Sequence, residues 1–290
     1  MNSNNYNKKA MITKRLNIIK NIVIYIFLTS WALMVLFPFF WMIITSLKTR
    51  AEYNSETIPH FYAIAPTFVH YKDAFIQEDM LRFITNTTFY ALFTTFLMVI
   101  VSILAAFAFA RLEFKGKNLV FTLFLAMMMI PNELIIITNY QTITNLNMRD
   151  TFSALILPST LSVFYIYLLR QNFMQVPDAM YYASKVDGAN DFQYLLKMLI
   201  PLSKPTIITI TILKIIECWN AYIWPKLVTT EESHFIVSNA IQMIKQNGFG
   251  RDNIPGMMAA VTIVSIPLII TFIIFRKQIM SGVRKTGTKG

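Results

Sequence analysis

The sequence predicts an all-α integral membrane protein, a bundle of six transmembrane helices with both termini in the cytoplasm. Its 290 residues are 55% hydrophobic and only 14% charged, with a mean hydropathy of +0.50, which is too apolar for an ordinary soluble domain. The apolar residues fall into six runs, each of about the 20 residues that a helix needs to cross the hydrocarbon core. Strand-like alternation is absent from the sequence, and helices satisfy their own backbone hydrogen bonds in lipid.

The first apolar run follows a basic N-terminal segment, residues 1–20, that looks like the start of a signal peptide. The run itself is longer than a signal-peptide core and ends without a small-residue cleavage site, so we expect an uncleaved span. The transmembrane domain is predicted over residues 21–276, and a cytoplasmic tail, 277–290, follows it. The predicted spans lie near 20–47, 84–110, 118–138, 152–169, 199–226 and 256–275.

The lysine and arginine residues predict the orientation. With the N-terminus inside, 17 of them fall in cytoplasmic segments and 8 in outer segments. Cytoplasmic loops carry the excess of positive charge, so both termini are expected in the cytoplasm. The net charge of +11 is then a topology signal. Because the basic residues flank apolar runs and do not form one soluble face, they argue against a nucleic-acid partner.

Proline residues interrupt several of the predicted spans. Pro38, Pro131 and Pro158 lie within spans, and Pro201 and Pro205 lie at the start of the fifth. Each removes a helix hydrogen bond and bends its helix, and transporters use broken helices to line a pathway. Proline is also common in membrane helices in general, so the pattern alone leaves both interpretations open.

Catalytic and cofactor-binding patterns are missing from the sequence. Cys218 is the only cysteine, and the three histidines have no ligand-like spacing, so neither an internal disulfide nor a metal site is expected. The sequence has no phosphate-binding loop of the G-x-x-x-x-G-K-[ST] type and no common hydrolase motif. We therefore expect no enzyme activity and no cofactor bound by this chain, and any ATPase must be a separate subunit.

A polar insert, residues 177–197, separates the fourth and fifth spans on the cytoplasmic side. Pro177 suits the first position of a helix, and Asp178 in the first turn complements the helix dipole. Gly188 supplies a natural stop about three turns later. The insert is therefore predicted to begin with a short helix that ends in a glycine hinge.

A second helix is predicted to follow the hinge. Asn190 reads as its N-cap, and Gln193 three residues later gives the spacing of a capping box. The helix is expected to continue until Pro201 ends it.

The first helix of the insert offers a candidate docking face. Met180, Ala183 and Ser184 share one side by their i, i+3, i+4 spacing, and the small residues leave a shallow surface that a partner can approach. An amphipathic helix resting on lipid headgroups fits the same spacing equally well.

The insert resembles the EAA signature of binding-protein-dependent ABC importer permeases. That signature is a Glu-Ala-Ala triplet, two residues, an Asp-Gly-Ala triplet and, about ten residues later, an apolar-Pro pair. The matching residues here are Tyr182-Ala183-Ser184, Asp187-Gly188-Ala189 and Ile200-Pro201-Leu202. Other segments are similar to the second (MalG-type) permease subunit of carbohydrate importers and to glycerol-3-phosphate permeases: 38–49, 66–75, 128–133, 167–178, 219–225 and the C-terminal GTKG.

The resemblance implies a type I ABC importer permease that crosses the bacterial cell membrane several times, in contact with lipid. The insert would be the coupling helix, seated in a groove of a cytoplasmic ATP-binding subunit. A second, homologous permease would complete a heterodimer, and two ATP-binding subunits would hold ATP and Mg²⁺. A substrate-binding protein, extracellular or lipid-anchored, would deliver the substrate. The expected docking residues are Met180, Tyr181, Tyr182, Ala183, Ser184, Asp187, Gly188 and Ala189.

One position departs from the family pattern. Tyr182 stands where the family usually has Glu, so a carboxylate contact to the ATPase is not available. Docking would then rest on packing by Ala183 and Ser184, while Asp187 and Gly188 keep the turn.

Charged and aromatic residues in the fifth span are candidates for the translocation pathway. Lys214 and Glu217 are three residues apart, and because charges at membrane depth are costly, they are expected to face the bundle interior or a wet cavity. A structural ion pair and a pathway role both fit this pattern.

Trp219 and Asn220 could pair with a polyhydroxylated solute, since sugar rings stack on aromatic faces and amides bond hydroxyl groups. An interfacial aromatic belt is the alternative for Trp219 to Trp224. Asn132 and Glu133 follow a proline in the third span and are further pathway candidates, with capping of the broken helix as the alternative.

These observations together predict an ATP-driven importer that moves a sugar or oligosaccharide across the membrane by alternating access. The same family also offers glycerol 3-phosphate and polyols as substrates. An ion-coupled secondary transporter is a rival interpretation, and in it Lys214 and Glu217 would have to form the ion site. A membrane scaffold that only recruits a cytoplasmic partner is another.

Overall fold

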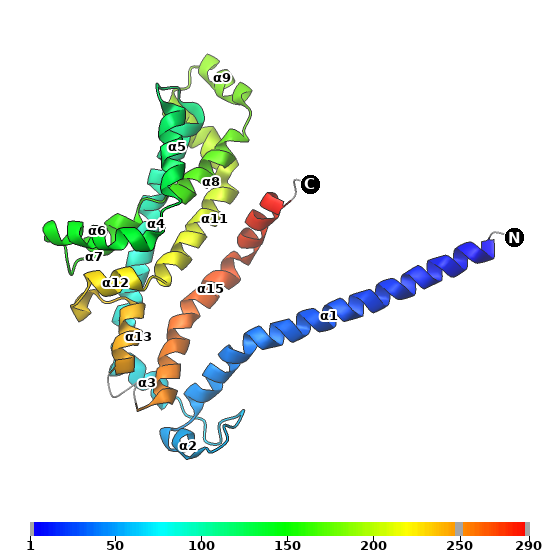
Figure 1. Ribbon diagram of the computed structural model, residues 1–290, viewed down its shortest axis with the longest axis vertical. Coiled ribbons are helices and arrows are strands. Elements are labelled where there is room, and N and C mark those ends of the chain that lie inside the picture. The colour runs from blue at the N-terminus through cyan, green and yellow to red at the C-terminus, as the bar shows by residue number, and fades with distance from the viewer. Residues whose placement is uncertain (1–2, 247–251, 288–290) are drawn as a thin grey trace.

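Every regular element in the computed structural model is a helix, within the two ranges that it describes, residues 3–246 and 252–287. The all-α fold class is therefore confirmed. The longest helices are α1 (Ser3–Leu47), α4 (Met80–Arg111), α11 (Ile200–Trp219) and α15 (Ile254–Gly287). Helix α4 packs against α11, and α11 packs in turn against α15 (Figure 1).

Within the described residues, four helices are long and apolar enough to cross a membrane, or up to five crossings exist if one bent helix pair counts as a single span. They are Leu16–Leu47, Met80–Arg111, Asp191–Trp219 and Ile254–Gln278. The bent pair lies in the predicted fourth span. A count of six spans therefore stays a prediction, and so does the placement of both termini in the cytoplasm.

The predicted third span, 118–138, forms two helices. Helix α5 (Lys117–Met127) has 11 residues and so extends about 16 Å, roughly half of the hydrocarbon core. Pro131 follows at the break and precedes α6 (Asn132–Asn145), which lies across the long helices in Figure 1.

The predicted fourth span is bent by 44°. It consists of α7 (Phe152–Ile156), the 3₁₀ turn η1 (Leu157–Ser159) and α8 (Val163–Met174). Pro158 lies within η1, so this proline marks the bend, just as Pro131 marks the break after α5. Pro38 and Pro205, by contrast, lie inside helices that continue through them.

Two ends of the bundle are distinct in Figure 1. One carries α9 (Asp178–Val186) and α10 (Asp191–Tyr194), and is called the insert end. The half of the molecule opposite the insert, called the loop end, carries α2 (Arg50–Ser55), α3 (Val69–Ile76), α12 (Ile223–Val228), the 3₁₀ turn η3 (Glu232–His234) and α13 (Val237–Gln246), with α12 nearest the middle (Figure 1). The predicted fifth span, 199–226, is divided at this end, because α11 stops at Trp219 and α12 follows as a separate helix.

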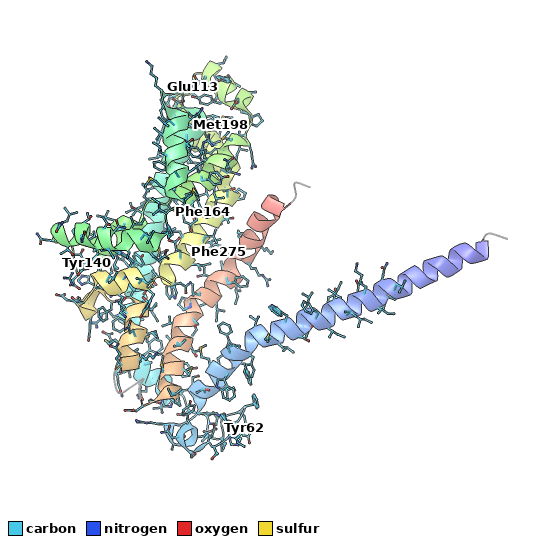
Figure 2. All side chains as sticks on the ribbon, in the orientation of Figure 1. Tyr62, Glu113, Tyr140, Phe164, Met198 and Phe275 are labelled. Atoms are coloured by element: carbon cyan, nitrogen blue, oxygen red, sulfur yellow. The ribbon has the colours of Figure 1, made fainter. Side chains whose placement is uncertain are left out.

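Helix α1 diverges from the other helices (Figures 1 and 2). None of its most apolar 18-residue window is buried within the chain, and only its last residues, such as Thr45 and Ser46, lie in protein contacts. The predicted N-terminal segment, 1–20, continues this helix from Ser3, and the predicted tail continues α15 to Gly287. Residues 1, 2 and 288–290 lie outside the described ranges.

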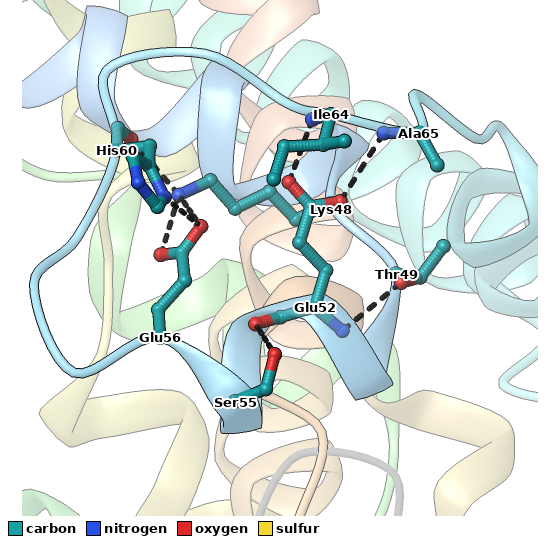
Figure 3. A network of polar contacts seen from close by, with 8 residues as sticks. All are labelled: Lys48, Thr49, Glu52, Ser55, Glu56, His60, Ile64 and Ala65. Atoms are coloured by element: carbon teal, nitrogen blue, oxygen red, sulfur yellow. Dashed lines mark hydrogen bonds and ion pairs between the residues drawn. The ribbon is translucent and has the colours of Figure 1, made fainter.

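The segment after α1 is held by its own side chains (Figure 3). The ammonium group of Lys48, only 1% exposed, lies 2.7 Å from both carboxylate oxygens of Glu56 and donates to the carbonyl of His60 at 2.9 Å. The carboxylate of Glu52 accepts the backbone N–H of Ile64 at 2.7 Å. These bonds give the loop a fixed conformation without a strand or a long helix.

Candidate functional site

The first helix of the insert ends where the sequence predicts and begins one residue later, because Pro177 is its N-cap and not its first helical residue. Pro177 precedes α9 with φ −59° and ψ 137°, and Asp178 is its first residue. Gly188 has φ +81°, the left-handed conformation that glycine adopts most easily. The N–H of Gly188 bonds the carbonyl of Lys185 at 3.0 Å, and that of Ala189 bonds the carbonyl of Ser184 at 2.9 Å. This pair of bonds is a Schellman motif, so the predicted glycine stop is confirmed.

The second helix of the insert starts as predicted but does not end as predicted. Asn190 and Gln193 form a capping box, with each side chain bonded to the other residue's backbone N–H. A five-residue π-helical segment, Leu195–Leu199, then joins α10 to α11, and the helix runs on to Trp219. The prediction that Pro201 ends the helix is wrong. A π segment has a wider turn than an α-helix, which relieves the contact between a proline ring and the preceding carbonyl groups.

Arg111, the last residue of α4, anchors the start of the insert. Its side chain is 3% exposed and donates to the carbonyls of Phe173 and Val176 at 2.7 and 2.6 Å. It also forms an ion pair with Asp178 at the first turn of α9. One buried guanidinium therefore ties the corner between α8 and α9 to the C-terminal end of α4.

A second group of contacts braces α9 against α10. The hydroxyl of Tyr181 donates to Asp191 at 2.6 Å, and the ammonium group of Lys185 lies 2.7 Å from the same carboxylate oxygen. Burial and this hydrogen bond raise the pKa of Tyr181 to about 12. The Tyr181 ring also packs edge-on against Tyr194, with centroids 5.0 Å apart. Helix α9 is therefore braced to the bundle at both ends.

The outward face of α9 differs from the predicted one. Ser184 is only 5% exposed and its hydroxyl bonds the carbonyl of Tyr181, so it lies on the inner side of the helix. Met180 is half-buried. The exposed face is formed by Ala179, Tyr182, Ala183 and Val186, at i, i+3, i+4 and i+7. The prediction that Ser184 shares an accessible face with Ala183 is wrong, because spacing alone does not say which side packs on the rest of the chain.

The remaining predicted docking residues lie at the C-terminal end of α9. Asp187 is its C-cap and is exposed, and Ala189 is half-buried beyond the turn. Tyr182 is 60% exposed, and its ring contacts that of Tyr181. Tyr182 therefore stands free on the side of α9 that faces away from the bundle.

Lys214 and Glu217 form the ion pair that their spacing suggests, with the two atoms 2.8 Å apart. Lys214 is 3% exposed, whereas the side chain of Glu217 is 56% exposed. The hydroxyl of Tyr165 on α8 donates to the second carboxylate oxygen of Glu217 at 3.0 Å. The result is a buried cation behind a carboxylate that stays open on one side of the chain.

Trp219 lies in the protein interior, 6% exposed, with its indole N–H bonded to the carbonyl of Val264 on α15. Trp224 bonds the carbonyl of Ala154 in the same way, so neither ring behaves as a free member of an aromatic belt. Asn220 is exposed next to Trp219.

Asn132 and Glu133 open α6, and Glu133 is exposed in its first turn, where an acidic residue complements the helix dipole. Within the described residues no hydrogen bond or ion pair joins Glu133 to Lys214 or Glu217.

Sequence reasoning missed Arg111 and Tyr165. Arg111 entered only the count of basic residues, and Tyr165 looked like an ordinary apolar position in the fourth span. Their partners lie 67 and 52 residues away, so no local spacing signals either contact.

Comparisons with known proteins agree with this architecture. A family model described as "Binding-protein-dependent transport system inner membrane component" matches residues 98–285. The chain is 30% identical over 257 residues to the sulfoquinovosyl glycerol transport system permease protein SmoH of Agrobacterium fabrum, covering 88% of this chain and 89% of that protein. It is 26% identical over 275 residues to the arabinooligosaccharides transport system permease protein AraQ of Bacillus subtilis, covering 93% and 96%.

The chain is also 29% identical over 201 residues to the sn-glycerol-3-phosphate transport system permease protein UgpE of Shigella flexneri, covering 69% of this chain and 72% of that protein. Among solved structures, it is similar to a chain of a bacterial ABC transporter involved in the import of the acidic polysaccharide alginate. The TM-score is 0.78 at 23% identity, and the match covers 89% of this chain and 96% of that chain. This similarity supports the fold.

Proposed function

The chain belongs to the family of binding-protein-dependent transport system inner membrane components, and on that premise we propose that it is the permease subunit of an ATP-driven importer for a sugar or oligosaccharide. It is a multi-pass protein of the cell membrane and not an enzyme. The mechanism is alternating access, in which closure of two ATP-binding subunits moves α9 and switches the bundle between inward-facing and outward-facing states. ATP and Mg²⁺ are held by those subunits.

The observation that carries this proposal is the insert. Helix α9 is tied to α4 through Arg111 and to α10 through Asp191, yet it turns a shallow face of Ala179, Ala183 and Val186 away from the bundle. A helix that is fixed to the bundle on one side and has an exposed face on the other can transmit the motion of a partner bound to that face to the bundle. We assign that face to a groove in the ATP-binding subunit, with Tyr182 inside the contact.

The pathway is assigned to the surface that contains Glu217. Its carboxylate is held by Lys214 and Tyr165 and stays open on its remaining side, where a hydroxyl group of a passing solute can donate to it. A second permease of the same family would close this side of the pathway. Glu217→Gln is expected to raise the KM for uptake. Because the change also removes the counter-ion of the buried Lys214, the yield of assembled complex is measured beside it.

The substrate class rests on the named relatives. Sulfoquinovosyl glycerol and arabinooligosaccharides favour a sugar or oligosaccharide. Glycerol 3-phosphate is a second candidate, favoured by the similarity to UgpE. The partners proposed are a homologous permease, two ATP-binding subunits and a substrate-binding protein at the loop end.

The test is uptake into proteoliposomes that contain the chain with these partners. Arabinooligosaccharide, sulfoquinovosyl glycerol and glycerol 3-phosphate are offered one at a time, after a ligand screen on the cognate binding protein. Uptake should require both ATP and the binding protein. Uptake that persists without ATP while the ion gradient is clamped would contradict the importer. A complex whose ATP turnover does not respond to any loaded binding protein would instead indicate a scaffold.

A further inference from the structure

A cavity of about 860 Å³ lies at the loop end, between the end of α11, α13 and α15. Its volume is within the range of small-molecule sites. The cavity is separate from the Lys214–Glu217 pair, whose carboxylate faces Tyr165 on α8. Figure 1 shows α13 lying beside the lower parts of α4 and α15 at this end.

The wall contributed by α13 is one helix face. Ser238, Ile241, Gln242 and Lys245 follow each other at i, i+3, i+4 and i+7 and all line the cavity. The opposite face of α13, where Ala240 and Ile244 are fully buried, belongs to a buried apolar cluster with α4 and α15. Helix α13 therefore holds its polar residues toward the cavity because its apolar side is fixed in the core.

Aromatic rings form the second part of the wall. The ring of Trp219 is fixed by its bond to the carbonyl of Val264. Tyr222 is 45% exposed, and its hydroxyl donates to the side-chain oxygen of Gln242 at 2.7 Å. That bond orients the amide of Gln242 and leaves its N–H groups free to donate. Aromatic faces beside oriented amide donors suit a ring that carries hydroxyl groups.

Two polar groups in the wall have no partner among the described residues. The hydroxyl oxygen of Ser238 is buried and makes no hydrogen bond. Lys245 is exposed, and no carboxylate belongs to the described wall. A lipid tail in the cavity would cover the ammonium group of Lys245 and the amide N–H groups of Gln242 without offering them a hydrogen bond, which is costly, so a lipid tail is a poor occupant.

We propose that this cavity is a carbohydrate subsite at the outer mouth of the pathway, and that Lys245 favours a sugar ring with an acidic substituent. The inference rests on the proposed function for the direction of transport. The ring lies against Tyr222, its hydroxyl groups bond the amide of Gln242, and its acidic group faces Lys245. A solute released by a binding protein at the loop end would meet this site before it reaches Glu217.

A thiol-protection experiment tests the site in the assembled importer. Cys218 is buried, so Ile241→Cys places a reporter thiol in the cavity wall against a low background. The rate of labelling by a membrane-impermeant thiol reagent is measured in the presence of digalacturonate, in the presence of the matched neutral galactobiose, and without either. Both disaccharides should slow labelling, and digalacturonate should do so more strongly. Leu227→Cys on α12, outside the cavity, should be labelled at the same rate with and without either disaccharide.

Lys245→Gln in the same reporter background should weaken protection by digalacturonate about two- to fivefold, the effect of one partly exposed charge pair, and leave galactobiose unchanged. Lys72→Gln, an exposed lysine on α3, is the matched control. No protection by either disaccharide would overturn the subsite even if ATP-driven uptake is intact. Equal protection by both, unaffected by Lys245→Gln, would overturn the role of the lysine. Protection without ATP-driven uptake would keep the subsite and reject the importer.

Discussion

At Gly188 the backbone alone decides which residues are tolerated. A Cβ atom added there meets nothing within 4 Å, so a substitution is not limited by space. The φ of +81° costs an L-residue about 1–2 kcal/mol, least for asparagine and most for a β-branched residue. Gly188→Val should therefore reduce binding-protein-stimulated ATP turnover several-fold, while Gly188→Asn should largely retain it. Wild-type stimulation in the valine variant would refute the role of this turn.

At Tyr182 the side chain, and not the backbone, decides which residues are tolerated. This side chain is 60% exposed and makes no hydrogen bond in the described chain. Tyr182→Glu should leave the stability of the chain within about 0.5 kcal/mol, as surface changes usually do. We expect co-purification of the ATP-binding subunit to be retained or slightly stronger, since this change restores the residue usual in the family.

Phe192→Glu is the matched control, since Phe192 is also 60% exposed but lies on α10. If Tyr182→Glu abolishes co-purification while Phe192→Glu does not, the groove has adapted to tyrosine.

Among the helices, the anchor between α4 and the insert should depend on Arg111 more than on Asp178. Arg111 is buried and holds two carbonyl groups, whereas the side chain of Asp178 is 76% exposed. Arg111→Gln should cost about 2–4 kcal/mol locally, and Asp178→Asn less than about 1 kcal/mol. Hydrogen exchange of the α9 amides measures the difference.

The arginine variant should also lose ATP-coupled uptake, because α9 would then move without α4. Arg82→Gln is the control, an arginine at the loop end whose ion pairs are exposed. Equal exchange in the Arg111 and Arg82 variants would show that α9 is held by other contacts.

The loop after α1 should open at acidic pH. The hydrogen bond from Lys48 holds the pKa of Glu56 below its ordinary value of 4.5, against the opposing effect of burial. Because the pKa of Glu56 is lower in the folded loop, its ionised carboxylate stabilises the loop at pH values above the ordinary pKa. This contribution is lost as the pH falls through the lowered pKa. Limited proteolysis between α2 and α3 should therefore accelerate below about pH 4.5. In Glu56→Gln, cleavage should already be fast at neutral pH, and a wild-type pH profile in that variant would contradict the assignment.

For the molecule as a whole, the sequence predicts best where structure is local. The stop at Gly188 and the capping box of Asn190 and Gln193 depend on residues within a few positions, and each was found as predicted. The proline residues show where prediction from local sequence fails. Pro158 lies in a bend whereas Pro205 lies within a continuous helix, so the same side chain gives both outcomes. The inward position of Ser184 and the reach of Arg111 depend likewise on packing between distant segments.

The apolar length of α1 is not covered by any other part of the described chain. Its window in Leu16–Leu47 has a hydropathy of 2.2 with none of it buried, whereas 39% of the window in α4 is buried. Lipid tails cover such an apolar surface at no cost but do not fix the helix. Only close packing against another protein would hold α1 in one position. If a homologous permease completes the pathway, α1 is the element of this chain most available to pack against it.

A nitroxide at Met34→Cys, a site 69% exposed on α1, should be mobile in the chain alone and immobilised when the second permease is present. Val186→Cys on α9 should stay mobile in both samples, because its expected partner is the absent ATPase. Unchanged mobility at position 34 would place α1 against lipid in the assembled pair and leave the pairing to the bundle helices.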